Sequence, residues 1–210
     1  MKTLFSIVVF SLLLAACTPA AATAPVTAPQ PTQQTPFPIS AEGNFTGSPQ
    51  DFILHELGGL YLAADAGTGT PNSHALEVRP DGQAYIEATG RLDGWQIQFN
   101  RSAEGDAPAF IVNVVNMYSS HEGALLVLSR DWHQDVWTKI DSGELTLLPE
   151  IPDPGADQLI WTDAAGTIGV EMIYRNLYIF FTGPSEGVDQ YEFFANLARQ
   201  HLAWIQAQEP

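Results

Sequence analysis

The sequence predicts an α+β domain in which helices pack on a mostly antiparallel sheet of about six to seven strands. Two observations lead to this class. Segments of strand character follow one another in two runs and are joined by short turns, as in antiparallel sheets. Segments with apolar residues at helical spacing precede, separate and follow these runs. The expected order is therefore a short helix, about four strands, a long central helix, three strands and a C-terminal helix.

The first helix is expected within residues 48–59. Ser48 can cap it, Pro49 suits the first helical position, and Asp51 favours the first turn. A pair of glycines near the end of this segment is expected to close the helix, because glycine readily adopts the left-handed conformation found there.

The first run of strands is expected to follow this helix. Residues 80–82, Pro-Asp-Gly, have the composition of a turn, and the segments 75–79 and 83–88 are expected to be strands on either side of it. Residues 95–101 alternate apolar and polar side chains, which indicates a strand with one buried face. Residues 109–118 are more continuously apolar and are expected in the centre of the sheet.

The central helix is expected to be about 20 residues long. Ser119 and Glu122 fit a capping box at its start, and Gly143 would end it. Between these ends, apolar residues recur at helical spacing: Leu125, Leu128, Trp132, Val136 and Ile140.

Three further strands are expected after a loop at 145–157 that is rich in proline and aspartate. Only Arg175 and Asn176 separate the last two strands, which predicts a tight hairpin. Asn176 is expected to adopt the left-handed conformation of the turn, and Arg175 is expected to lie in solvent. The strands are predicted at 158–162, 167–174 and 177–182.

The C-terminal helix is expected over 189–208. Asp189 and Glu192 form a variant of the capping box at its start. Its apolar face includes a histidine, which is expected to be a hydrogen-bonded core residue rather than a ligand. This face comprises Phe194, Leu197, His201 and Ile205.

The order of elements resembles the Mog1/PsbP-like fold, which also occurs in small secreted mycobacterial lipoproteins and in extracytoplasmic sensor domains. The resemblance lies in residues 166–182, a hairpin with Arg and Asn at its turn, and in the capped helix that ends with His-Leu-Ala-Trp-Ile at 201–205. It covers roughly the last third of the chain. It implies a fold and an extracytoplasmic location, and it transfers no functional residue.

The N-terminal segment predicts a membrane anchor. Lys2 precedes an uncharged run whose apolar centre, residues 4–14, is too short for a transmembrane helix and is typical of a secretion signal. Residues 14–17, Leu-Ala-Ala-Cys, resemble the lipobox of bacterial lipoproteins. This resemblance implies cleavage before Cys17 and acylation of that cysteine, for which palmitate is the expected label. Cys17 is the only cysteine of the chain, so it has no disulfide partner within the chain.

The expected organisation is a signal peptide at 1–16, the lipidated cysteine with an uncharged Pro-, Thr- and Ala-rich linker at 17–39, and one folded domain at 40–210. The formal net charge of −16 excludes nucleic acid as a partner, because an acidic surface repels polyanions. The predicted partners are the membrane, through the lipid, and an unknown envelope protein or small ligand. The predicted location is therefore extracytoplasmic, at the membrane surface.

No metal site and no cofactor are predicted. Residues 131–135, Asp-Trp-His-Gln-Asp, place two carboxylates and an imidazole close together in the sequence. In a helix, however, the histidine would point away from both aspartates, which would form an exposed ladder with Lys139.

The tryptophans are the candidate ligand-binding residues. Trp95, Trp132 and Trp204 fall on apolar faces of their elements and are expected in the core. Trp137 and Trp161 fit neither face clearly. If they are exposed beside the sheet, they could provide an aromatic platform for a ligand.

The predicted function is non-enzymatic binding or sensing by a lipid-anchored protein at the cell envelope. No catalytic motif is present, so no catalytic residue is assigned. Two alternatives stay open. A secreted acidic hydrolase acting on envelope polysaccharide would need two carboxylates facing each other across a cleft. A structural or assembly factor of an envelope complex would instead expose a contiguous apolar patch.

Overall fold

The computed structural model describes residues 36–59, 61–104, 107–152, 154–184 and 190–210. Within these residues, helices cover one eight-stranded antiparallel sheet, which confirms the predicted α+β class. The predicted signal peptide, Cys17 and most of the predicted linker lie outside the described residues, as does the expected cap residue Asp189.

The sheet has the strand order β1-β3-β4-β8-β7-β6-β5, and the short strand β2 pairs with β3 outside this path. Neighbouring strands are antiparallel throughout. The strands are β1 (Tyr61–Ala63), β2 (Thr68–Gly69), β3 (Arg91–Arg101), β4 (Phe110–Tyr118), β5 (Leu145–Leu147), β6 (Asp157–Asp163), β7 (Thr167–Tyr174) and β8 (Leu177–Pro184). The three strands of the second predicted run are therefore confirmed, and β5 is an additional edge strand within the predicted loop.

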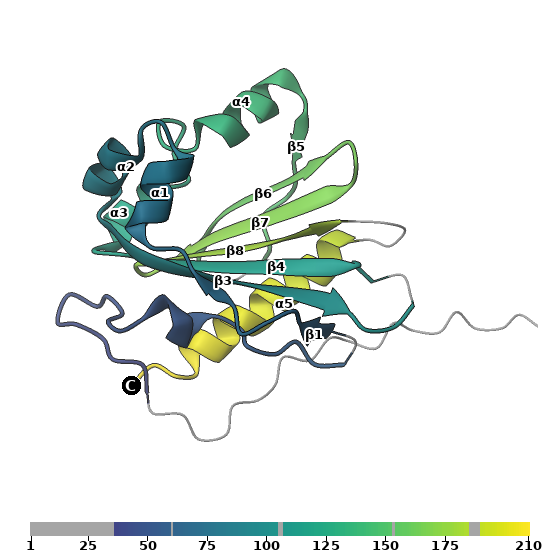
Figure 1. The fold of residues 1–210 in the computed structure, drawn as a ribbon, viewed down its shortest axis with the longest axis horizontal. Coiled ribbons are helices and arrows are strands. Elements are labelled where there is room, and N and C mark those ends of the chain that lie inside the picture. The colour runs from purple at the N-terminus through teal and green to yellow at the C-terminus, as the bar shows by residue number, and fades with distance from the viewer. Residues whose placement is uncertain (1–35, 60, 105–106, 153, 185–189) are drawn as a thin grey trace, which may run out of the picture.

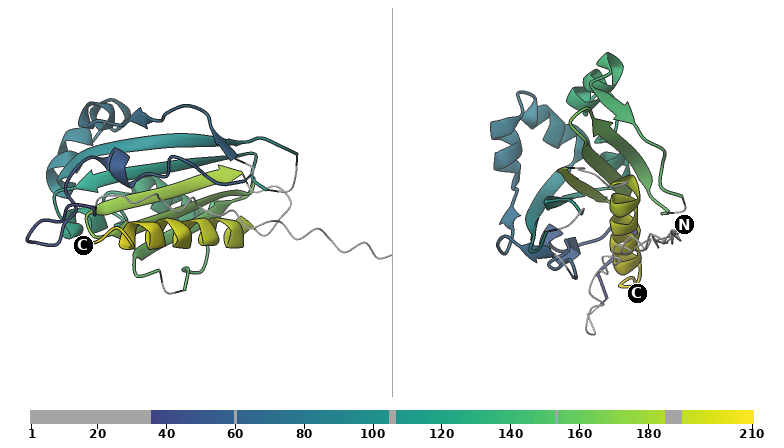
Figure 2. Two further views of the ribbon diagram at one scale, coloured as in Figure 1. Left: turned by 90° about the horizontal axis from the view of Figure 1, so that it is seen from below. Right: turned by 90° about the vertical axis from the view of Figure 1, so that its right-hand side faces the viewer.

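The helices lie on opposite faces of the sheet (Figure 1). Helix α5 (Gln190–Gln206) and the 3-10 helix η1 (Pro49–Phe52) cover one face. Four short helices stand over one end of the other face, and Figure 2 shows them well separated from α5. They are α1 (Asn72–Val78), α2 (Gly82–Thr89), α3 (His121–Leu126) and α4 (Gln134–Ser142). Among the described helices, none has the length and apolar character that a membrane span requires.

The main core lies between α5 and the sheet. The predicted apolar face of α5 is confirmed, because all four of its residues are buried. His201 is fully buried, and its Nε2 lies 2.7 Å from the carbonyl oxygen of Phe52. Burial lowers the pKa of His201 to about 4, so the ring is neutral at physiological pH. This residue is thus the hydrogen-bonded core histidine that the sequence predicts.

The N-terminal segment is tied to this core. Phe37, which lies within the predicted linker, is buried and packs against Phe45, Phe52 and Trp204. Asn176 fixes the segment from the hairpin side. Its amide group donates to the carbonyl of Phe45 at 3.0 Å and accepts from the backbone N–H of the same residue at 2.7 Å.

The prediction of strands at 75–79 and 83–88 is wrong, because both segments are helical. The Pro-Asp-Gly sequence between them is not a hairpin turn. It ends α1 and begins α2, with Asp81 in the cap position. Gly82 allows the two helices to approach closely, since a side chain there would overlap the backbone of Ala75 and Leu76.

The prediction of one long central helix is also wrong, because the segment forms α3 and α4 with a break between them. Ser120 rather than Ser119 caps α3, and its hydroxyl accepts from the backbone N–H of Gly123 at 3.1 Å. At the break, the carbonyl of Leu128 accepts from the indole of Trp137 at 2.9 Å. The predicted end at Gly143 is confirmed by its left-handed conformation.

Two local expectations need correction. The first helix is only one turn long, although its predicted capping box, from Ser48 and Asp51, is present. At the hairpin turn, Arg175 rather than Asn176 has a positive φ, of 50°. Arg175 is not free in solvent either, because its guanidinium forms a bidentate pair with Glu209 at 2.9 and 2.7 Å.

Candidate functional site

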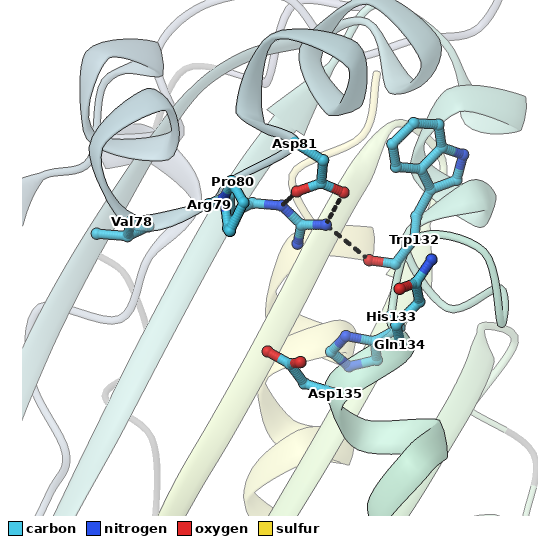
Figure 3. Close-up of a pocket in the computed structure, with 8 residues that line it drawn as sticks. All are labelled: Val78, Arg79, Pro80, Asp81, Trp132, His133, Gln134 and Asp135. Atoms are coloured by element: carbon cyan, nitrogen blue, oxygen red, sulfur yellow. Dashed lines mark hydrogen bonds and ion pairs between the residues drawn. The ribbon is translucent and has the colours of Figure 1, made fainter.

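Two adjoining cavities open beside helix α1 and the α1–α2 turn. The larger, of about 320 Å³, lies between the α1–α2 turn and the start of α4 (Figure 3). It is lined by Val78, Arg79, Pro80, Asp81, Trp132, His133, Gln134 and Asp135. The smaller, of about 220 Å³, is lined by Thr70, His74, Ala75, Val78, Arg79, Tyr85, Arg91, Gln96, Val114 and Asn116. Val78 and Arg79 line both cavities, which together are called the groove below.

Arg79 joins the two walls of the groove. Its guanidinium pairs with both carboxylate oxygens of Asp81, at 3.1 and 3.0 Å, and donates across the cavity to the carbonyl of Trp132 at 3.1 Å (Figure 3). It also lies over the ring of Tyr85, 4.2 Å from the ring centre. The Arg79 hydrogen bonds hold the pKa of Asp81 below its usual range. The α1–α2 turn is thereby fixed to the segment that precedes α4.

A buried carboxylate lies on the groove face of the sheet. Glu171 of β7 is only 1% exposed, and it accepts from Trp161 Nε1 at 2.7 Å and from the hydroxyl of Tyr178 at 3.1 Å. His133 Nε2 lies 2.8 Å from Glu171 Oε2, within ion-pair distance but without a hydrogen bond of good geometry. Side chains from β6, from β8 and from the cap of α4 therefore surround this one carboxylate of β7.

A hydrogen-bonded pair of tyrosines, Tyr85 and Tyr118, lies on the same side of the sheet. The hydroxyls of Tyr85 and Tyr118 lie 2.8 Å apart, and both residues are buried. Burial raises the pKa of each, most strongly that of Tyr118. The two phenols therefore stay protonated and act only as neutral hydrogen-bonding groups.

Arg91 closes this network at the start of β3, where it is 6% exposed. Its guanidinium donates to the side chain of Asn72 at 2.8 Å, to the side chain of Asn116 at 2.9 Å, and to the carbonyl and hydroxyl of Thr70 at 2.6 and 3.1 Å. A side chain at Gly94 would overlap these groups, so glycine makes room for the guanidinium there.

The structure places the two predicted ligand-binding tryptophans near the groove, but they do not line either cavity. Trp161 is half-buried and its indole donates to Glu171. Trp137 is half-buried on α4, with Arg130 stacked 4.4 Å from its ring centre. A direct ligand contact of these two residues stays a prediction. Trp132, predicted in the core, is half-buried: it packs against the core cluster that contains Tyr85 and Tyr118, and it also lines the larger cavity.

The predicted carboxylate ladder of residues 131–135 is only partly present. Asp131 lies in the turn before α4 and His133 is the cap residue, so the helical ladder reduces to Asp135 and Lys139. Within the part of the chain that the structure describes, no three His, Cys, Asp or Glu side chains gather as a metal site would require.

The carboxylates of the larger cavity bear on the hydrolase alternative. Asp81 and Asp135 line it from opposite walls. A glycosidase needs one carboxyl that holds a proton near neutral pH, which requires a raised pKa. The pair with Arg79 instead lowers the pKa of Asp81. Asp81 therefore lacks the raised pKa that the acid of a glycosidase needs.

A third cavity, of about 400 Å³, lies at the end of the sheet beside the N-terminal segment and includes Glu42, Leu92 and Asn176 among its lining. The amide of Asn176 already bonds three backbone groups, in Phe45 and Tyr118. Of these three cavities in the described residues, the groove is the one that has a buried charged side chain, Arg91, in its lining.

The sequence pointed to only part of the groove. Residues 131–135 drew attention as a possible metal cluster, and four of them line the larger cavity. Arg79 and Arg91 are singled out by no motif, and Glu171 lies in a segment whose pattern predicts only a buried strand. For Glu171 the available signal was chemical. A glutamate within the apolar run of residues 168–173 must be buried and therefore needs hydrogen-bond donors from other elements.

No protein-family model matches the chain, and none of the curated proteins is significantly similar to it in sequence. Among solved structures, the extracellular domain of PknH from Mycobacterium tuberculosis is similar, with 11% identity and a TM-score of 0.36. The match covers 71% of this chain and 82% of that domain. The resemblance to the Mog1/PsbP-like fold stays a prediction. The function of this chain therefore has to be inferred from the residues of the groove.

Proposed function

We propose that this protein binds a small molecule in the groove and is a binding or sensing domain rather than an enzyme. The groove itself carries this proposal. Its two cavities, of about 320 and 220 Å³, are together of the size of ligand sites in proteins. Apolar and aromatic walls, from Val78, Tyr85 and Trp132, stand beside hydrogen-bonding groups that the fold holds in fixed positions.

The residues that line the groove support binding over covalent chemistry. They include no serine, cysteine or lysine, and their one threonine hydroxyl, in Thr70, is engaged by Arg91. An activated serine, cysteine, threonine or lysine nucleophile is therefore missing from the lining.

The location is part of the same proposal and is supported by the sequence alone. A lipid on Cys17 would hold the domain at the outer side of a membrane, and the uncharged linker would separate it from the lipid surface. The membrane is then one partner and the ligand of the groove is the other. The two alternatives, a polysaccharide hydrolase and an assembly factor, stay predictions.

A thermal-shift screen of the purified full-length protein tests the binding proposal. Sugars, peptides and small metabolites would be compared, because a ligand that binds only the folded state must raise its stability. We expect at least one class to raise the melting temperature in a concentration-dependent way. A flat screen on folded protein would contradict the proposal.

Two tryptophan substitutions on α1 locate the site. Val78→Trp should fill the groove and abolish the shift, because Val78 lines both cavities and is exposed. Leu76→Trp is the matched control, since Leu76 is exposed on the same helix and lines neither cavity. Ligands that stabilise both variants equally would place the binding site elsewhere.

A further inference from the structure

Arg91 is a buried cation that no carboxylate of the described residues compensates. The ion pairs found within these residues involve other cations, and all the acceptors of Arg91 are neutral oxygens of Thr70, Asn72 and Asn116. A guanidinium cannot give up its proton at physiological pH. The positive charge therefore persists in a buried position, where it is costly without an opposite charge.

The other buried charge on this side of the sheet cannot compensate it. Glu171 lies on β7, and strands β4 and β8 separate β7 from β3, the strand of Arg91. Three inter-strand spacings amount to roughly 14 Å. Glu171 also has its own partners, in Trp161, Tyr178 and His133.

The smaller cavity gathers positive charge in an otherwise acidic protein. Arg79, Arg91 and His74 line it, and no aspartate or glutamate does, although the chain has a formal net charge of −16. Arg79 is already paired with Asp81, which leaves one uncompensated guanidinium. Val114 and the ring of Tyr85 supply an apolar wall beside it.

We propose that the smaller cavity binds the carboxylate of a small organic monoanion with an apolar or aromatic body. This inference rests on the proposed binding function and names the ligand class for the same groove. Carboxylates form the strong hydrogen bonds that guanidinium groups favour, and Arg91 Nε takes no part in the bonds that Arg91 makes within the described residues. A single negative charge matches the single uncompensated cation, and the apolar body lies against Tyr85 and Val114.

Three probes that share one skeleton and differ in charge test this proposal: phenylacetate, the neutral phenylacetamide and the cationic phenethylamine. Isothermal titration calorimetry on the full-length protein would give the Kd of each. We expect phenylacetate to bind about tenfold or more tightly than either of the others, as one charge interaction in a partly buried site implies.

The decisive variant is Gln96→Glu, because Arg91→Gln would remove bonds that hold the fold. Gln96 is exposed and lines the smaller cavity, so the substitution places a negative charge there without disturbing the core. We expect it to weaken phenylacetate binding by about tenfold and to leave phenylacetamide binding unchanged. Gln98→Glu is the matched control, since Gln98 is exposed on the same strand and lines neither cavity.

The outcomes separate this inference from the proposed function. If phenylacetamide or phenethylamine binds as tightly as phenylacetate and Val78→Trp blocks that binding, the groove is a binding site and the inference about charge is overturned. Equal effects of Gln96→Glu and Gln98→Glu would overturn it as well. If none of the three probes binds at millimolar concentration, the inference fails, and the thermal-shift screen decides the proposed function independently.

Discussion

Acidification should destabilise this protein through protonation of His201, and substitution of this one residue should remove that part of the pH dependence. The pKa of His201 is about 4 in the folded protein and 6.5 in the unfolded chain. Between these values the unfolded state binds a proton that the folded state does not, so stability falls as the pH falls. At pH 4.5 the loss relative to pH 7 is about 2.5 kcal/mol from this residue alone.

Urea denaturation at pH 7 and pH 4.5 would measure this loss in the wild type and in His201→Gln. Glutamine can still donate to the carbonyl of Phe52 but does not titrate, so the variant should lose about 2.5 kcal/mol less stability than the wild type. Carboxylates with lowered pKa values, such as Asp81 and Glu209, destabilise both proteins alike and cancel in the difference.

His55→Gln is the matched control. The exposed ring of His55 also contacts a backbone carbonyl, that of Gln50 at 3.0 Å. This variant should follow the wild-type pH dependence. If wild type and His201→Gln lose the same stability within about 0.5 kcal/mol, the idea that burial keeps this ring neutral is wrong.

Three further predictions concern other parts of the chain. Asn176→Ala should lower the free energy of unfolding, measured by urea denaturation, by about 3 to 5 kcal/mol, because it leaves three buried backbone groups of Phe45 and Tyr118 unpaired. The control is Asn196→Ala, at an exposed position, which should lower it by less than about 1 kcal/mol. Gly94→Ala should destabilise by about 1 to 3 kcal/mol and weaken phenylacetate binding, since the added methyl displaces Arg91 and Asn116; unchanged calorimetric affinity would contradict this. Cys17→Ser should abolish incorporation of labelled palmitate in cells, and equal labelling of mutant and wild type would refute the anchor.

The elements with strong, long sequence patterns were predicted well. Strands β3 and β4 and the hairpin β7–β8 have enough alternating or continuous apolar residues to define their type. The C-terminal helix is 17 residues long, and all four residues of its predicted apolar face are buried. In these elements, local preference and tertiary packing favour the same structure, so the sequence is sufficient.

Short segments were predicted poorly, because their type depends on contacts made elsewhere. Helix α1 has only seven residues, and a single turn or two carries too few apolar positions to distinguish a helical from a strand period. The break between α3 and α4 depends on bonds that no local pattern contains. One is the bond of the Trp137 indole to Leu128, and the other is the bond of Arg79 to Trp132.

These two wrongly predicted segments are the two walls of the groove, and the coincidence has a physical reason. Helices α1 to α4 have six to nine residues each, and isolated helices shorter than about 12 residues are marginal in water. Their positions therefore depend on cross-groove contacts such as Arg79 to Trp132, rather than on their own sequences. A ligand that touches both walls would add to those contacts and stabilise the least independent part of the fold. Binding in this groove should thus order the four short helices more than the sheet or α5, which is the response expected of a sensing domain.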